Sequence, residues 1–70
     1  MNDLTYVQKR VYYSIKDFIE KNGYSPSFRE IAKLNGNNSV ATVQFHMKRL
    51  RNKGYIQYED KKSRTVKIVK

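Results

Sequence analysis

Residues 38–54, NSVATVQFHMKRLRNKG, decide the fold of this chain. Apolar side chains recur in this stretch at the spacing of one helix face, at Val40, Val43, Met47 and Leu50. Asn38 or Ser39 can supply the N-cap oxygen for the first free amides, and Gly54 can take the left-handed conformation that ends a helix. The stretch therefore predicts one amphipathic helix with well-marked ends.

The opposite face of this helix is polar and basic. At roughly 100° per residue, the outward positions and their flanks are Ala41, Thr42, Gln44, Phe45, Lys48, Arg49 and Asn52. They are small or hydrogen-bonding near the start of the helix and cationic near its end. This gradient is expected if the first turns enter a major groove and the last turns meet phosphate. We interpret the helix as a recognition helix.

The length and charge of the chain fit this interpretation. Its 70 residues suffice for one small domain, 1–70, and leave no room for a separate catalytic domain. Lys and Arg number 15 against six Asp and Glu, and no carboxylate lies between Glu30 and Glu59. Such a surplus favours a polyanionic partner, because each neutralised phosphate releases counterions. Charge and helix pattern together favour nucleic acid over an acidic protein or a membrane surface.

Several other classes of protein are disfavoured. The chain has no cysteine and one histidine, His46, so we expect no metal site and no other cofactor. No spacing of Ser, His and carboxylate indicates a catalytic arrangement, so we expect no enzyme, and no small-molecule ligand is evident. The sequence contains no apolar run long enough to span a bilayer and no signal-peptide pattern, which predicts a cytoplasmic protein without a membrane partner.

A first helix is predicted from Leu4 to Asn22. Thr5 and Gln8 have the spacing of a capping box at its start, and Gly23 closes it. Five apolar residues at helical spacing are expected to form its buried stripe: Val7, Val11, Ile15, Phe18 and Ile19. Its outward side chains carry mixed charges, which are typical of an ordinary solvated face.

A second, short helix is predicted after Pro26, which biases the preceding residue towards an extended conformation. Ser27 and Glu30 have capping-box spacing at its start. Its inward side chains are expected to be Ile31, Ala32 and Leu34. Gly36-Asn37-Asn38 can then make a tight turn into the recognition helix, because Gly and Asn tolerate positive φ. The two helices and this turn have the pattern of a helix-turn-helix.

After residue 54 the apolar period changes from helical to alternating. Residues 55–58 and 65–69 are predicted strands, and the charged segment 59–64 between them is the loop of a hairpin. The fold class is therefore mostly α, of the α+β kind. It is a three-helix winged helix-turn-helix with a C-terminal two-stranded β-hairpin wing.

Motifs along the whole chain are more specific than these patterns. They are the segment 24–32 (YSPSFREIA), Ser39, Thr42-Val43 and the segment 46–56 (HMKRLRNKGYI). Together with the opening helix, they resemble the DNA-binding domain of the LexA repressor family. The resemblance implies a winged helix-turn-helix that represses transcription by binding palindromic operators through the helix at 39–51.

Carried over residue by residue, the resemblance places the base-contacting side chains at Ser39, Ala41, Thr42, Gln44 and Phe45. It also implies contacts to the DNA backbone from Ser27, Arg29 and the wing. Leu34-Asn35 departs from the family, which more often has the leucine next to the glycine, so the packing before the turn is expected to differ. The family's repressors continue into a self-cleaving peptidase domain that also dimerises them. The resemblance of residues 1–70 therefore implies neither cleavage nor stable dimerisation.

The chemistry of the outward side chains leaves alternatives open. Gln44 can hydrogen-bond an adenine edge and Thr42 can meet a thymine methyl, but both also suit a solvated helix surface. Phe45 has three interpretations of equal weight: contact with thymine methyls, packing on a partner protein, or folding back onto the wing. Backbone contacts are further predicted from Asn38, Lys48, Arg49, Lys53, Lys61, Lys62 and Arg64. Cations are favoured near helix C-termini in any case, because of the helix dipole.

The leading hypothesis is a sequence-specific regulator of double-stranded DNA, and a palindromic target is expected to hold two copies. The rival is a winged-helix protein-interaction module, of a phage or plasmid type, that holds an acidic partner protein through Phe45 and the cationic face. A third reading is RNA binding. A base preference that depends on Gln44 or Thr42 would separate the first hypothesis from the others.

Overall fold

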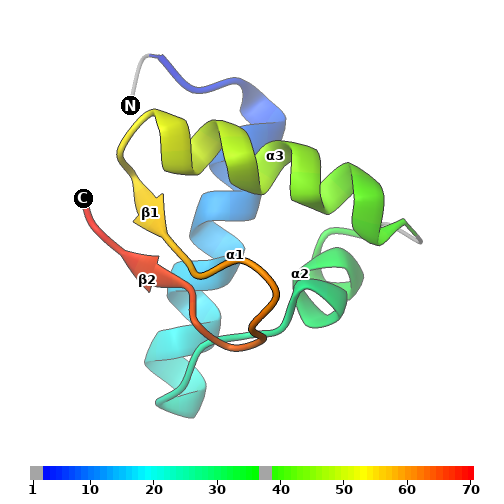
Figure 1. Ribbon diagram of the computed structural model, residues 1–70, viewed down its shortest axis with the longest axis vertical. Helices are drawn as coiled ribbons and strands as arrows, with labels where there is room; N and C mark the ends of the chain where they lie inside the picture. The colour runs from blue at the N-terminus through cyan, green and yellow to red at the C-terminus, as the bar shows by residue number, and fades with distance from the viewer. Residues whose placement is uncertain (1–2, 37–38) are drawn as a thin grey trace.

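Three helices and a short hairpin surround a common core in the computed structural model, which describes residues 3–36 and 39–70 (Figure 1). The elements are α1 (Tyr6–Asn22), α2 (Phe28–Leu34), α3 (Val40–Asn52), β1 (Ile56–Gln57) and β2 (Lys67–Ile68). The strands are antiparallel, and Ile56 pairs with Ile68. This order confirms the predicted winged helix-turn-helix.

Both predicted capping boxes are present, and they determine where α1 and α2 begin. The Thr5 hydroxyl accepts from the Gln8 amide at 3.1 Å, and the Gln8 side chain accepts from the Thr5 amide at 3.1 Å. Ser27 and Glu30 make the same reciprocal pair at α2. Because Thr5 is the N-cap and has extended backbone angles, α1 begins after it, and the predicted start at Leu4 is wrong.

The core draws side chains from each of the three helices and from the hairpin. Its most enclosed apolar members are Val11, Tyr12, Ile15, Ile31, Val43, Met47, Leu50, Ile56 and Val66. Three of them come from α3 and leave its opposite face free, as the periodicity predicts. The core therefore fixes which side of α3 points outward.

The buried stripe of α1 is rotated relative to the prediction. Val7 is 41% exposed, so its predicted burial is wrong, whereas Gln8 and Tyr12 are buried. The Tyr12 hydroxyl donates to the Lys70 carbonyl, and Gln8 Oε1 accepts from Lys53 Nζ at 3.2 Å. The polar tips can be buried because residues far along the chain satisfy them. Local periodicity does not contain that information.

The end of α2 also differs from the prediction. Leu34 is 50% exposed, so its predicted inward position is wrong. Asn35 Nδ2 donates to Ser14 Oγ at 3.0 Å and to the Ile31 carbonyl at 2.8 Å. This side chain joins the end of α2 to α1 in place of an apolar contact. The expected difference in packing at Leu34-Asn35 is therefore that Asn35 makes hydrogen bonds here while Leu34 is exposed.

The turn into α3 begins at Gly36, which has a φ of +70°. The rest of the predicted turn, Asn37 and Asn38, lies outside the described residues. Ser39 is the N-cap of α3, because its hydroxyl accepts from the Thr42 amide at 3.4 Å. The choice between two capping residues is therefore settled in favour of Ser39.

The two strands are shorter than the predicted segments 55–58 and 65–69. At the open end of the hairpin the Val69 amide still donates to the Tyr55 carbonyl at 2.9 Å, whereas towards the loop two backbone amides bond to side chains. The Glu59 amide donates to Thr65 Oγ1 at 2.9 Å, and the Val66 amide donates to Ser25 Oγ at 3.0 Å. Through the bond to Ser25, one leg of the loop is attached to the segment before α2.

Gly54 connects α3 to β1 with a φ of +83°. An added Cβ would meet only Lys70 Cε at 3.9 Å, so the position is open but conformationally demanding. We expect Gly54→Ala to lower the free energy of unfolding by about 1–2 kcal/mol, since a left-handed conformation strains an L-residue. Urea denaturation measures the change. Asn52→Ala, on the exposed end of α3, is the control and should change stability by less than about 0.5 kcal/mol.

Candidate nucleic-acid interface

The outward face of α3 is continuous and unoccupied by the rest of the described chain. Its exposed side chains are Ala41, Thr42, Gln44, Phe45, Lys48, Arg49 and Asn52. The helix has no acidic residue in its first turn, and its last turn carries Arg49 and Arg51. The predicted gradient, from small and hydrogen-bonding groups to cations, is thus present on an exposed surface. Such a helix can enter a major groove with its first turns.

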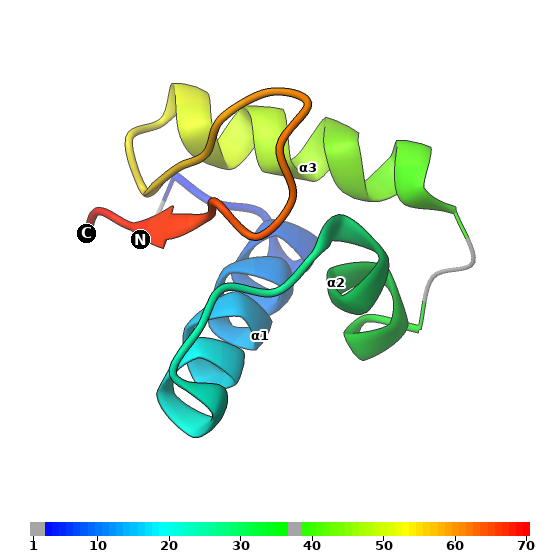
Figure 2. The same ribbon diagram turned by 60° about the horizontal axis from the view of Figure 1, so that its bottom comes forward.

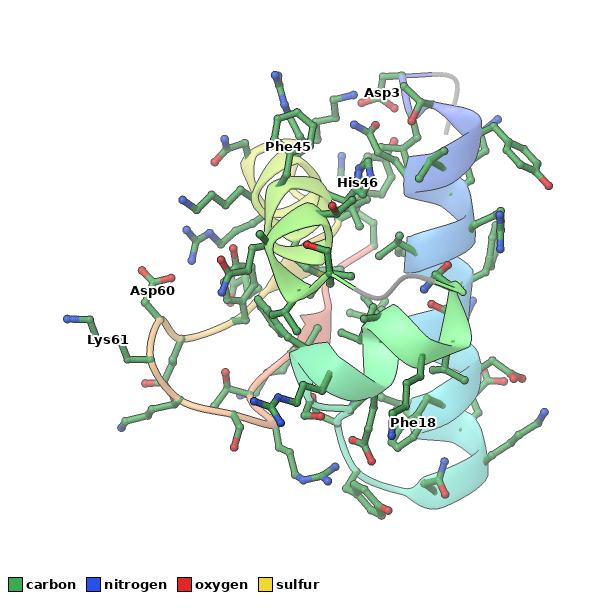
Figure 3. All side chains as sticks on the ribbon, turned by 90° about the vertical axis from the view of Figure 1, so that its right-hand side faces the viewer. Asp3, Phe18, Phe45, His46, Asp60 and Lys61 are labelled. Atoms are coloured by element: carbon green, nitrogen blue, oxygen red, sulfur yellow. The ribbon has the colours of Figure 1, made fainter. Side chains whose placement is uncertain are left out.

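Phe45 does not fold back onto the wing, which removes one of its three interpretations. Its side chain is 54% exposed, and Figure 3 shows it pointing away from the wing tip, where Asp60 and Lys61 lie. The Arg49 guanidinium lies over its ring at 5.0 Å. The His46 ring lies at a steep angle to the Phe45 ring with the ring centroids 5.5 Å apart, and His46 itself is half-buried. The two interpretations left for Phe45 are contact with thymine methyls and packing on a partner protein.

The wing lies beside α3 (Figure 2). Side chains of the wing and of α3 line a groove of about 370 Å³. Gln44 and Lys48 form its helix side. Its other walls are Phe28, Tyr58, Glu59, Asp60, Lys61, Lys62 and Ser63. The groove brings two of the predicted DNA-contacting residues of α3 to the same surface as the two wing lysines. A single duplex could therefore meet both elements.

One leg of the wing is attached to α3 through Arg51. The guanidinium stacks on the Tyr58 ring at 4.1 Å, and Nη1 donates to the Tyr58 carbonyl at 3.4 Å and to Asp60 Oδ1 at 3.2 Å. The Phe28 ring meets Tyr58 edge-on at 5.3 Å, which connects the same leg to α2. These contacts hold the wing at a fixed distance from the recognition helix. Arg51 also neutralises Asp60, which would otherwise repel phosphate.

Arg64, predicted as a DNA-backbone contact at the wing tip, lies at the other leg of the wing. Its Nη1 donates to Glu30 Oε1 at 2.8 Å and to the Ser25 carbonyl at 3.2 Å, and its guanidinium lies over the Tyr24 ring at 5.1 Å. Arg64 has a φ of +58°, so the chain bends sharply there. The side chain joins the wing to the start of α2. Its contact with DNA stays a prediction, and its internal bonds give it a second, positioning role.

The Glu30 carboxylate serves both the capping box and the Arg64 ion pair. Hydrogen bonds from the Ser27 amide and from Arg64 lower the pKa of Glu30 below its ordinary value of 4.5. A carboxylate with a lowered pKa stabilises the fold above its ordinary pKa, and that contribution is lost as the pH falls through the lowered value. Glu30 thus links the wing to acid stability.

We expect Glu30→Gln to reduce stability at pH 7, and we expect this difference from the wild type to shrink as the pH falls below 4.5 and Glu30 becomes protonated in both states. Urea denaturation at several pH values measures this difference. Glu20→Gln, on the outer face of α1, serves as the matched control and should change stability at pH 7 by less than about 0.5 kcal/mol. A difference of the same size at every pH, down to the acid unfolding of the wild type, would mean that the carboxylate charge is not the cause.

Lys53, another predicted backbone contact, lies against the N-terminal segment. Its Nζ donates to the Asp3 carbonyl and to Gln8 Oε1. The Tyr55 hydroxyl donates to Asp3 Oδ1 at 2.5 Å, and this bond lowers the pKa of Asp3 and raises that of Tyr55. Lys53 therefore helps to hold residue 3 and the start of α1 on the end of α3. Its contact with phosphate stays a prediction.

The remaining predicted DNA-backbone contacts lie in α2, in the wing and before α3, and they stay predictions. Arg29 is exposed in the first turn of α2. Ser27 is the N-cap of α2, and its hydroxyl accepts a hydrogen bond from the Glu30 amide. Lys62 pairs loosely with Glu59 at 3.9 Å, whereas Lys61, with a φ of +64°, has no ion pair among the described residues. Asn38 lies outside the described residues. Lys61 is thus the more available of the two wing lysines.

Sequence reasoning missed the residues that position the wing. Phe28 and Tyr58 form an aromatic contact across 30 residues of chain, and Glu30 pairs with Arg64 across 34. Such long-range partners leave no local pattern to detect. The sequence does show aromatic residues beside charged segments. It does not show which of these aromatic residues contact each other in the fold.

The described residues contain neither a membrane-spanning helix nor a cluster of metal ligands. None of the helices in the described parts of the chain is both long and apolar enough to cross a membrane. Within residues 3–36 and 39–70, no group of three His, Cys, Asp or Glu side chains is placed to hold a metal ion. The candidate site in the described part of the chain is the exposed face of α3 with the adjacent wing.

The fold and this surface define a winged helix-turn-helix domain. The sequence matches the family model of the LexA DNA-binding domain over residues 1–65. It is similar to the LexA repressor of Staphylococcus aureus (strain N315), at 42% identity over 69 residues, covering 99% of this chain and 33% of that protein. It is also similar to the LexA repressor of Syntrophobacter fumaroxidans, at 47% identity over 55 residues, covering 79% of this chain and 27% of that protein.

The chain belongs to the LexA DNA-binding domain family. It spans about a third or less of the length of the curated relatives that it matches.

Proposed function

We propose that the chain is the sequence-specific DNA-binding part of a transcriptional repressor, a cytoplasmic regulator and not an enzyme. The observation that carries the proposal is the exposed face of α3, with its polar start and cationic end, beside a wing that carries Lys61 and Lys62. Membership of the LexA DNA-binding domain family supports it. Repression follows from occupancy, because a protein bound at an operator excludes the transcription machinery.

In this proposal the first turns of α3 lie in the major groove of double-stranded DNA. Ser39, Thr42 and Gln44 offer hydroxyl and amide groups to base edges. Lys48 and Arg49 meet phosphates beside the groove, and Lys61 meets the backbone from the wing. Two copies on a palindrome would repeat these contacts about a two-fold axis, one in each half-site.

Selection from a randomised duplex pool at near-physiological salt tests the proposal. We expect enrichment of a palindrome, with half-sites centred about one helical turn apart or closer. Transcription from a promoter that carries the enriched sequence should then fall when the chain is produced. Salt-sensitive retention of all duplexes without enrichment would contradict sequence-specific recognition.

A protein-interaction module is the second candidate, and the 54% exposure of Phe45 favours it. An exposed aromatic ring next to Arg49 could hold an acidic partner protein by packing and charge. This candidate predicts weak DNA binding without sequence preference. It also predicts a stoichiometric protein complex that Phe45→Ala abolishes.

A further inference from the structure

An apolar strip interrupts the polar face of α3. Phe45 is 54% exposed, and Ala41, one turn earlier on the same side, is exposed as well. Residues 39–47 contain neither Lys nor Arg. The part of the helix that would enter a major groove therefore presents methyl and ring carbons beside the groups of Ser39, Thr42 and Gln44, and it presents neither Lys nor Arg.

Two side chains of the same helix contact the Phe45 ring in the free chain. Arg49 stacks over it at 5.0 Å, and the His46 ring packs against it at an interplanar angle of 73°. A side chain that is already restrained loses less conformational entropy on binding. The same arrangement leaves the exposed guanidinium of Arg49 at the edge of the apolar strip, in reach of a phosphate if the ring contacts a base.

Base edges in the major groove differ in the partners they require. Guanine is most often read by a bidentate Arg or Lys, and the first two turns of α3 offer neither. Pyrimidines that carry a C5-methyl group present a carbon surface, which suits Ala and Phe side chains. Gln44 flanks the strip and can bond the adenine that pairs with thymine.

We propose that Phe45, together with Ala41, reads the C5-methyl group of pyrimidines in the operator. The inference rests on the proposed DNA-binding function and names its target class. Two bases carry this methyl group, thymine and 5-methylcytosine. Each half-site should thus contain a T·A pair under the first two turns of α3, and a methylated cytosine at that position should bind better than an unmethylated one.

The experiment uses the duplex enriched by selection and measures its affinity for the full 70-residue chain by fluorescence anisotropy. Each thymine of the half-site is replaced by uracil, which keeps the base pair and removes only the methyl group. In a second series the same pair becomes C·G, with or without a C5-methyl on the cytosine. We expect about a fourfold loss of affinity per methyl removed at one or two positions of each half-site.

Variants assign the effect to Phe45. In Phe45→Ala the ratio of the affinity for the thymine duplex to that for the uracil duplex should fall to about 1. Phe45→Leu should retain part of the preference for thymine. Tyr6→Ala is the matched control, because Tyr6 is an aromatic residue of α1 with 75% exposure, and it should leave the ratio unchanged. Circular dichroism verifies that each variant is folded.

Equal affinity for thymine and uracil duplexes at every position would overturn the inference. It would also be overturned if Phe45→Ala kept the wild-type ratio of affinity for the thymine duplex to affinity for the uracil duplex. A half-site enriched without any thymine would overturn it while leaving sequence-specific DNA binding intact. Failure to enrich any sequence would instead remove the proposed function and the inference with it. Tight binding of a methylated C·G duplex in place of T·A would identify 5-methylcytosine as an equivalent target.

Discussion

Leu50→Ala is expected to lower the free energy of unfolding by about 2–5 kcal/mol. Leu50 is completely buried on the inward face of α3, where it belongs to the common core. Removing three side-chain carbons there loses their burial and leaves a cavity that a close-packed interior fills only partly. A domain of 70 residues has only a few kcal/mol of net stability, so the variant should be largely unfolded at 37 °C.

The chain provides a matched control for this prediction. Leu34→Ala makes the same chemical change at a side chain that is 50% exposed, and it should alter stability by less than about 0.5 kcal/mol. Thermal and urea denaturation followed by circular dichroism measure both variants. Equal destabilisation by the two substitutions would contradict the assignment of inward and outward faces that places the candidate site.

Gln44→Ala is expected to change which sequences are bound. Gln44 is exposed beside the groove between α3 and the wing, and a bidentate contact from its amide to adenine would supply about 1–3 kcal/mol of discrimination. Its loss should relax the preference at one position of each half-site by roughly 5- to 150-fold. Selection repeated with the variant, followed by affinity measurements on single-base changes, measures this effect.

Two controls separate base reading from general attraction. Gln57→Ala removes an exposed glutamine from β1, outside α3, and should leave the preference unchanged. Lys48→Ala should weaken binding to all sequences alike and reduce the slope of log affinity against log salt by about 0.9, the value for one phosphate contact. An unchanged preference in Gln44→Ala would show that the bases are read elsewhere.

Local signals in the sequence predicted the helices well. Thr5 with Gln8, and Ser27 with Glu30, form the capping boxes that their spacing indicates. A capping box is complete within four residues, so its energetics are contained in the local sequence. The inward face of α3 was predicted for a similar reason, because its period follows from helix geometry alone.

The errors lie where distant residues decide the packing. The predicted burial of Val7 failed because Gln8 and Tyr12 find partners at the far end of the chain, in Lys53 and Lys70. Burying a polar side chain is tolerated only where such a partner exists. A prediction from apolar periodicity places the most hydrophobic side chains in the core. It therefore assigned Val7, and not its polar neighbour Gln8, to the buried face of α1.

In the candidate site, too, features set by a single helix were predicted, and features set by distant partners were not. The outward side chains of α3 were predicted correctly as exposed, since each follows from its place on one helix. The internal bonds of Lys53 and Arg64 were not foreseen, because their partners come from other elements. Charge marks a residue as a possible phosphate contact, whereas only the fold shows whether that charge is already neutralised by a carboxylate.

The account rests on α3 being the element that meets DNA. Its most direct test is a two-dimensional NMR titration of the isotopically labelled chain with the selected duplex and with a scrambled duplex of equal length. We predict the largest amide shifts at residues 39–49 and at Lys61 and Lys62, in slow exchange only with the selected duplex. Shifts concentrated on the outer face of α1, with α3 unchanged, would contradict the account.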